Sequence, residues 1–267
     1  MDVTGLYRNR FSPEDRARKA RVWNVLYQQV FDRWIRPADV VVDLGAGFCE
    51  FINAARGRRR IAVDLNPEVR ELAGPGVEAR IAAASNLDFL TDAEVDVVFS
   101  SNFLEHLANK EEVTRTVQEA FRVLRTGGTL ILMGPNVRLV PGIYWDFFDH
   151  HVPLSDRSLS ELLAVTGFQL LQVQARFVPY TTRSAIPQAP WLVRLYLAMR
   201  PLSSALMGRQ FLIVARKAAA APGPQTKRGP QADRGPQTNR VPQTDPGPQT
   251  DRGPRTDRGP RTDPGRP

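Results

Sequence analysis

Short apolar runs alternate along this chain with segments in which apolar residues recur at helical spacing. The runs are rich in β-branched residues and predict buried strands, because strands of a covered sheet read as continuous apolar stretches. We expect these strands at 40–44, 61–65, 77–84, 95–100, 129–133, 168–177 and 210–216. We expect the main helices at 13–35, 111–124 and 155–166. Strands that alternate with helices predict an α/β fold with a parallel sheet covered on both faces.

Turn and capping residues indicate where these helices end. Pro37 follows the first helix, the Gly127-Gly128 pair the second, and Gly167 the third. Ser155 or Asp156 suits the start of the third helix. The first helix carries one apolar stripe, which we interpret as core, with a cover over a substrate cleft as the alternative. The stripe consists of Trp23, Leu26, Tyr27, Val30 and Trp34.

A glycine turn follows the first predicted strand. Asp43-Leu44-Gly45-Ala46-Gly47 ends that strand, and Asp64 ends the next one, 19 positions after Gly45. This is the layout of a nucleotide-binding βαβ unit, in which the second acid reaches ribose hydroxyls. The turn lacks the third glycine of the dinucleotide fingerprint, and Asp43 would repel a pyrophosphate. The pattern therefore favours a cationic or amine-bearing ligand over NAD, with a turn that binds nothing as the alternative.

Together these residues resemble motif I and the next acidic position of class I S-adenosylmethionine (SAM) methyltransferases. The stretches 103–107 (Phe-Leu-Glu-His-Leu) and 123–128 (Val-Leu-Arg-Thr-Gly-Gly) resemble further motifs of that family. The resemblance covers about residues 40–217. It implies a Rossmann-like, doubly wound, mostly parallel seven-stranded sheet whose last strand is antiparallel, with S-adenosyl-L-methionine as cofactor.

Ligands of open α/β sheets lie beyond the carboxyl ends of the strands, so the residues there form the predicted site. In the family resembled, the first acid and the glycines face the methionine part of SAM, and the second acid holds the ribose. The third strand ends without an acid, so a serine or an amide would have to contact the adenine. The predicted cofactor-binding residues are Asp43, Gly45, Ala46, Gly47, Asp64, Leu65, Ser85, Asn86 and Asn102.

A cluster of aromatic and histidine residues at 144–151 lies where this family places acceptor-binding residues. Methyl transfer is an in-line displacement, and a hydroxyl acceptor benefits from a general base with a pKa near 7. We predict that His150 or His151 is this catalytic base; the alternative is that both histidines only hydrogen-bond the loop backbone. The predicted substrate-binding residues are His106, Asn136, Tyr144, Trp145 and Phe148.

A metal site is a weaker alternative for the same segment. Asp146, Asp149, His150 and His151 offer ligand atoms for a divalent ion, but their spacing matches no closed zinc pattern. The sequence therefore predicts no metal. The single Cys49 excludes an internal disulfide and suits a reducing compartment; we interpret it as a packed side chain and not as a nucleophile.

Composition divides the chain into three parts. Residues 1–38 form the N-terminal helical segment that covers the cleft, 39–221 the methyltransferase domain with an insertion at about 180–208, and 222–267 a Pro/Gly-rich tail of six-residue repeats. The tail is poor in apolar residues, so we expect it to be disordered. It also carries nine Lys and Arg against five Asp, half of the net charge of +8. Because the tail holds half of the excess of positive over negative charge, nucleic acid is not favoured as a partner.

The leading function is SAM-dependent O-methylation of a small molecule, a saccharide or a glycolipid. The alternatives are an NAD-dependent oxidoreductase and a SAM-binding or scaffold protein without turnover. Met1–Arg21 lacks the apolar stretch of a signal peptide, and no run is long enough to span a bilayer, so we expect a cytoplasmic protein. The apolar stretch 186–206 suits peripheral membrane contact, a lid over the acceptor, or an ordinary packed helix.

Overall fold

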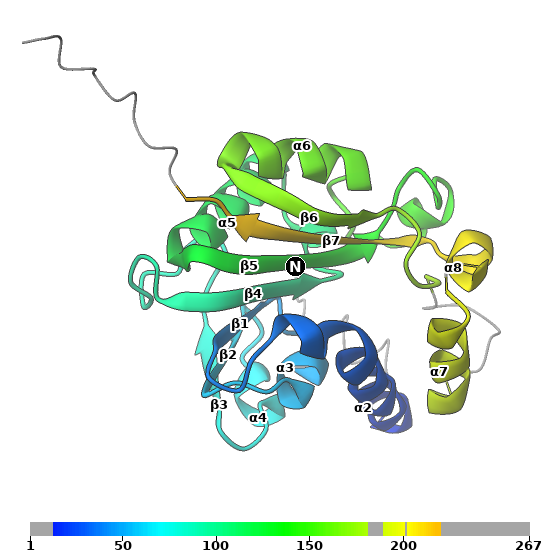
Figure 1. Cartoon of the computed structure of the whole chain (residues 1–267), viewed down its shortest axis with the longest axis horizontal. Coiled ribbons are helices and arrows are strands. Elements are labelled where there is room, and N and C mark those ends of the chain that lie inside the picture. The colour runs from blue at the N-terminus through cyan, green and yellow to red at the C-terminus, as the bar shows by residue number, and fades with distance from the viewer. Residues whose placement is uncertain (1–12, 181–188, 201, 220–267) are drawn as a thin grey trace, which may run out of the picture. The chain divides into compact units, whose positions relative to one another are not determined.

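A computed structural model describes residues 13–180, 189–200 and 202–219, which all belong to one compact unit, Met1–Ala221. At its centre lies a seven-stranded sheet of order β3-β2-β1-β4-β5-β7-β6 (Figure 1). The strands are β1 (Val40–Leu44), β2 (Arg59–Asp64), β3 (Val77–Ile81), β4 (Val95–Ser101), β5 (Leu124–Pro135), β6 (Phe168–Gln174) and β7 (Gln210–Lys217). The predicted tail, 222–267, lies outside the described residues.

The strand directions confirm the predicted fold class. The first five strands run parallel, and β7 pairs antiparallel with both β5 and β6. The helices are α2 (Pro13–Leu26), α3 (Glu50–Ala54), α4 (Val69–Leu72), α5 (Lys110–Val123), α6 (Asp156–Thr166), α7 (Pro190–Ala198) and α8 (Leu202–Met207). A π-helical turn (Tyr27–Phe31) and a 3₁₀ turn (Asp32–Trp34) continue α2, and two 3₁₀ helices lie at Leu104–His106 and Ile143–Asp146.

Two apolar layers cover the two faces of the sheet. Strand residues alternate between them, since successive side chains of a strand point to opposite faces. Val40 and Val42 pack with α5 and α6, whereas Val41 packs with α2 and α3. The layer on the side of α2 and α3 holds an aromatic cluster. In it the rings of Phe51 and Phe99 stack with their centroids 3.5 Å apart. Because both faces are covered, binding is confined to the ends of the strands.

Three predicted strand boundaries were wrong, of which one is the end of β6, at Gln174 and not at 177. The helix α5 ends at Val123, and β5 already begins at Leu124, so the Gly127-Gly128 pair lies inside the strand. It forms a bulge there: Gly127 has φ +76°, and a Cβ on Gly128 would lie 2.8 Å from the carbonyl oxygen of Arg125. The strand β3 ends at Ile81 and not at 84, because the chain turns at 83–86 with a hydrogen bond from Asn86 to Ala83.

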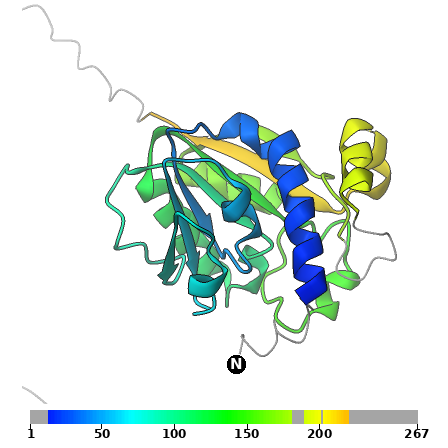
Figure 2. The ribbon, with the colours of Figure 1, turned by 90° about the horizontal axis from the view of Figure 1, so that it is seen from below.

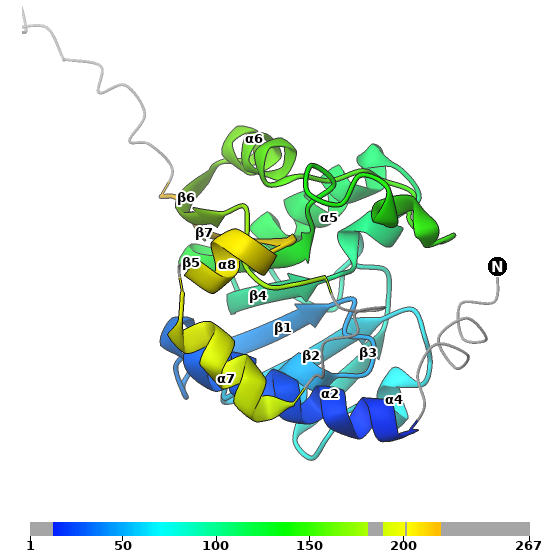
Figure 3. The same ribbon diagram turned by 90° about the vertical axis from the view of Figure 1, so that its right-hand side faces the viewer.

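Three helices gather at one end of the sheet. The helix α2 crosses the face opposite α6, with α7 and α8 beside it (Figure 2). The helix α7 packs against α2 and, with α8, occupies the predicted insertion between the last two strands (Figure 3). In the part of the chain that the structure describes, no helix is long and apolar enough to cross a membrane.

Candidate functional site

A cavity of about 610 Å³ lies between the carboxyl ends of β1, β4 and β5 and the helices α2, α7 and α8. The glycine turn forms part of its inner wall, and Asn102, Glu105, His106 and His150 form another part. Apolar side chains dominate the helical wall. The apolar residues of these helices are Val22, Trp23, Leu26, Leu192, Val193, Leu195, Tyr196, Met199, Leu202, Leu206 and Met207. Arg18, Lys19 and Ser203 also line the cavity.

The glycine turn after β1 requires glycine at its first position. Gly45 has φ +68°, and a Cβ added there would come within 2.2 Å of the ring of Phe103. Both Gly45 and Ala46 donate backbone hydrogen bonds to the carbonyl oxygen of Val63, which ties the turn to β2. The backbone therefore passes close beneath the end of β4, where no side chain fits.

Three carboxyl groups, those of Asp43, Glu50 and Asp64, lie around the turn, and the charges of Lys19 and Arg16 act on Glu50. Asp43 is buried; burial first, then the charges of Glu50 and Asp64, raise its pKa well above the usual range. Burial also raises the pKa of Glu50. Asp64 accepts hydrogen bonds from the backbone amides of Gly47 and Asn66, both at 2.8 Å. A cation placed beside these groups would relieve their mutual repulsion.

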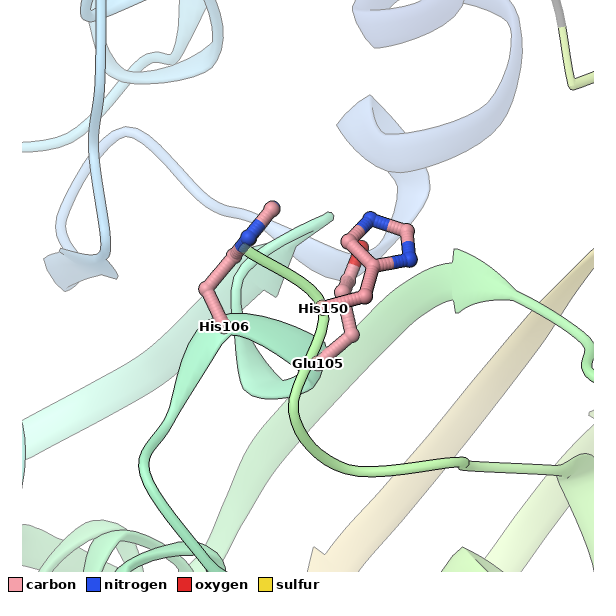
Figure 4. A group of neighbouring side chains, drawn as sticks. All are labelled: Glu105, His106 and His150. Carbon is pink, nitrogen blue, oxygen red and sulfur yellow. The ribbon is translucent and has the colours of Figure 1, made fainter. Parts of the chain in front are cut away.

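A second polar group lies where β4 ends. We call Glu105, His106 and His150 the carboxylate–histidine cluster: one ligand-type atom from each lies within 4.8 Å of the others (Figure 4). Glu105 is 2% exposed, and burial raises the pKa of its carboxyl. The rings of His106 and His150 meet edge to face at 4.9 Å. These side chains come from the 3₁₀ helix after β4 and from the loop before α6.

His106 is oriented by Asp149. Its Nδ1 atom lies 2.9 Å from the backbone oxygen of Asp149 and 3.2 Å from a carboxylate oxygen. Both partners are acceptors, so Nδ1 carries the proton and Nε2 of a neutral ring keeps its lone pair. Burial lowers the pKa of His106, but the hydrogen bond that His106 donates to Asp149 and the charge of Glu105 outweigh it and raise the pKa overall.

Two comparisons with known proteins point to the same kind of enzyme. A family described as "Methyltransferase domain" matches residues 42–132. A protein of Mycolicibacterium smegmatis named "Probable S-adenosylmethionine-dependent methyltransferase" is 29% identical over 189 residues, 62% of this chain and 72% of the relative. These matches support a class I SAM-dependent methyltransferase. The methyltransferase therefore uses SAM as its cosubstrate, as the glycine turn predicted.

Solved structures share the methyltransferase's fold. A SAM-dependent methyltransferase from Archaeoglobus fulgidus aligns with a TM-score of 0.55 and 19% identity over 73% of this chain and 92% of its own. One from Methanosarcina mazei aligns with a TM-score of 0.52 and 20% identity over 72% and 98%. At such identities the likeness concerns the fold alone, so the acceptor must be argued from the cavity.

The residues at the turn fit the cosubstrate. Because residue 45 is glycine, the Phe103 ring packs directly on the turn, and the backbone of residues 45–47 lines the cavity. The buried Oδ1 atom of Asn102, on the cavity wall, has no hydrogen-bond partner in the structure and can accept from an ammonium group. The electronegative group around Asp43 complements a sulfonium and an ammonium charge. Asn102, Asp43, Gly45, Ala46 and Gly47 would thus hold the methionine part of SAM.

The structure does not bring every predicted site residue of the methyltransferase to the cavity. Of the predicted residues, Gly45, Ala46, Gly47, Asn102, His106 and His150 line it. Asp43 lies buried behind the turn. The residues near the end of β2 and after β3 lie outside the cavity lining, Leu65 and Asn86 with exposed side chains. This set comprises Asp64, Leu65, Ser85 and Asn86.

Four of the predicted acceptor-binding residues do not reach the cavity. Tyr144 and Asn136 are fully buried and serve the fold: Tyr144 donates to the carbonyl oxygen of Val152, and the Asn136 amide donates to Asp156 at 2.7 Å. Trp145 and Phe148 point to solvent, 54% and 75% exposed. These four side chains lie outside the cavity lining, whereas Phe147 of the same segment is buried and lines the cavity.

His151 also lies away from the cavity. Its side chain is exposed, and its backbone amide donates to the carbonyl oxygen of Glu105 at 2.9 Å. Glu105 joins the histidines at the site but was missed from sequence, and Asp149, considered from sequence only as a metal ligand, orients His106. Its position as a charged residue inside the apolar run 103–107 could have indicated that Glu105 has a role at the site. No local signal distinguished Asp149 from the neighbouring Asp146.

Proposed function

We propose that this methyltransferase transfers a methyl group to a hydroxyl of a small-molecule, saccharide or glycolipid acceptor with a sizeable apolar part. One observation carries the proposal: a single cavity connects the glycine turn, the carboxylate–histidine cluster and the apolar wall of α2, α7 and α8. Donor site, proton acceptor and binding surface for an apolar group thus share one space. Its volume of about 610 Å³ is within the range of small-ligand pockets.

The chain's own residues would position the acceptor and take its proton. Bound SAM supplies an electrophilic sulfonium methyl group. Trp23 and Leu26 on one side, and Leu195 and Met199 on the other, would hold the apolar part and exclude water. The hydroxyl would then face the carboxylate–histidine cluster, which accepts its proton. Positioning of this kind contributes much of the rate of an in-line transfer.

The acceptor can be found by offering isotopically labelled SAM and fractionated cell extract to the purified protein. We expect label in an acid-stable and base-stable ether on a fraction with an apolar component. Label on nitrogen, or on a wholly polar acceptor, would count against the proposal. Titration with S-adenosylhomocysteine and with NAD checks the donor side, and binding of NAD alone would contradict it.

We also propose that α7 and α8 contact an anionic membrane surface near the mouth of the cavity. Trp191, Leu195, Leu202 and Leu206 on these helices are 50–67% exposed. Between Glu161 and Asp233 the sequence holds nine Lys and Arg but no acid. Of these, Arg194, Arg200 and Arg209 lie on or directly after the two helices. Exposed apolar side chains beside such cations suit an interface with anionic lipids.

Vesicle sedimentation tests this contact. We expect binding to phosphatidylglycerol vesicles and little binding to phosphatidylcholine vesicles. The double variant Trp191→Asp with Leu206→Asp should lose it, whereas Val165→Asp, at an exposed apolar position on α6, should not. If the double variant and the parent sediment equally, the membrane contact is disproved. That outcome says nothing about the proposed methyl transfer.

A further inference from the structure

The geometry points to a divalent-cation site in the carboxylate–histidine cluster, for Zn²⁺ or a chemically similar ion such as Co²⁺. The ligands would be a carboxylate oxygen of Glu105 and one ring nitrogen each of His106 and His150. Two imidazoles and one carboxylate form a donor set that zinc enzymes use, with a fourth position open to a further ligand. This set differs from the four residues considered from sequence, of which it includes only His150.

The first support is a buried oxygen atom. Glu105 is 2% exposed and lines the cavity, yet its Oε1 atom has no hydrogen-bond partner in the structure. A buried acceptor without a partner costs about 1–3 kcal/mol, more when it is charged. A cation bound beside Glu105 would satisfy this atom.

The second support is the orientation of His106. Its Nδ1 atom is engaged by the carbonyl and carboxylate oxygens of Asp149, so the nitrogen left for a ligand is Nε2. A metal-binding histidine whose other nitrogen donates to a carboxylate or carbonyl is the usual arrangement around zinc. Asp149 already holds His106 in that arrangement.

The spacing of the ligand atoms allows an ion after a small closure. The three atoms lie within 4.8 Å of one another. Tetrahedral zinc with bonds of about 2.1 Å places its ligands about 3.4 Å apart. The side chains would therefore close by up to about 1.4 Å, which rotations of Glu105 and His150 can supply.

The role of the ion rests on the proposed function, whereas its binding does not. With the ion bound, the three side chains would be its ligands and would no longer take the proton themselves. An acceptor hydroxyl at the open position would bind the ion through oxygen, and its O–H bond would break with the proton passing to solvent water. Zinc lowers the pKa of bound water to about 7, so a bound hydroxyl would ionise more readily as well.

Direct metal binding tests the site. Untagged protein, dialysed against chelator, is titrated with Zn²⁺ by calorimetry and with Co²⁺ by visible absorption. We expect one equivalent to bind, and we expect Glu105→Gln and His150→Gln to weaken binding at least about 100-fold. His151→Gln is the matched control: a neighbouring histidine outside the cluster, which should bind as the parent does. Absence of saturable binding, or equal binding by all variants, would overturn the site.

A second readout avoids variants that fail to fold. The chain has only three histidines, His106, His150 and His151, so their ring signals can be followed by NMR in the unaltered protein. Zn²⁺ should shift the signals of His106 and His150 and leave that of His151 in place. If the protein binds metal but methylates no hydroxyl, the proposed function is disproved and the metal site stands. If methylation continues at the full rate in the presence of chelator, only the role of the ion is disproved.

Discussion

The Nδ1 atom of His106 lies 3.2 Å from a carboxylate oxygen of Asp149, although 43 residues separate the two along the chain. The contact joins the 3₁₀ helix after β4 to the loop before α6. Backbone amides of the same loop, at His151 and Val152, donate to the carbonyl oxygen of Glu105. The loop that follows β5 is thus held against the end of β4, which closes one wall of the cavity.

We expect Asp149→Asn to lower the rate of methyl transfer by about 10–100-fold, the usual effect of losing the group that orients a functional histidine. Affinity for S-adenosylhomocysteine should not change, because Asp149 does not line the glycine turn. The measurement is the initial rate with labelled SAM, beside a calorimetric titration. Asp146→Asn, at an exposed position in the same segment, is the control and should keep the parent's rate.

Gly45→Ala should abolish cosubstrate binding and destabilise the fold. The new Cβ would meet the Phe103 ring at 2.2 Å and would hold a φ of +68° that L residues avoid. We expect a loss of about 2–4 kcal/mol in the free energy of unfolding and a clear loss of S-adenosylhomocysteine affinity. Gly142→Ala, where a Cβ meets nothing within 4 Å, should change neither quantity. A Gly45→Ala protein that binds with the parent's affinity would refute the close approach.

Cys49 should be inert in the native protein. Its side chain is fully buried, and burial first, then the charges of Asp43, Asp64 and Glu50, raises the pKa of its thiol. Because the thiolate is the reactive form, we expect a thiol reagent at pH 8 to react about 100-fold more slowly than with the denatured chain. Because Cys49 is the only cysteine of the chain, the modification reaction has a single rate. Rapid modification of the folded protein would contradict the predicted packing role.

Arg122 should matter more to stability than other surface arginines. It donates to the carbonyl oxygens of Leu87 and Leu90 and to the carboxylates of Glu119 and Asp92. We expect Arg122→Met to lower the free energy of unfolding by about 2 kcal/mol. Arg115→Met, which removes an exposed pair with Glu112, should cost less than about 0.5 kcal/mol.

The ion pair of Arg122 with Glu119 predicts that stability depends on pH. The hydrogen bond from Arg122 lowers the pKa of Glu119 in the folded state. The folded protein therefore binds fewer protons than the unfolded chain, so this stabilisation is present above a pH of about 4.3 and is lost as pH falls further. Denaturant unfolding between pH 3 and 7 should show a smaller acid loss for Arg122→Met than for the parent. Equal slopes would disprove the assignment.

The sequence predicted what depends on local spacing. Apolar runs and helical periodicity placed every strand of the sheet, and Ser155 and Gly167 marked the ends of α6 correctly. The wrong boundaries lie where a distant contact decides the local conformation. Gly127 and Gly128 resemble a helix end in sequence, but the register shift between β4 and β5 uses them as a bulge.

The amino-acid sequence by itself determined the fold class and the glycine turn, because the βαβ unit and its acids are contiguous in the chain. The resemblance of these motifs to a known family added the cosubstrate. Tertiary structure alone decided which side chains of 144–151 reach the cavity. His150 and His151 are adjacent in sequence, yet one is buried beside His106 and the other is exposed. That choice depends on how the loop packs against Glu105 and β4, and packing between segments some 40 residues apart leaves no periodic signal in the sequence.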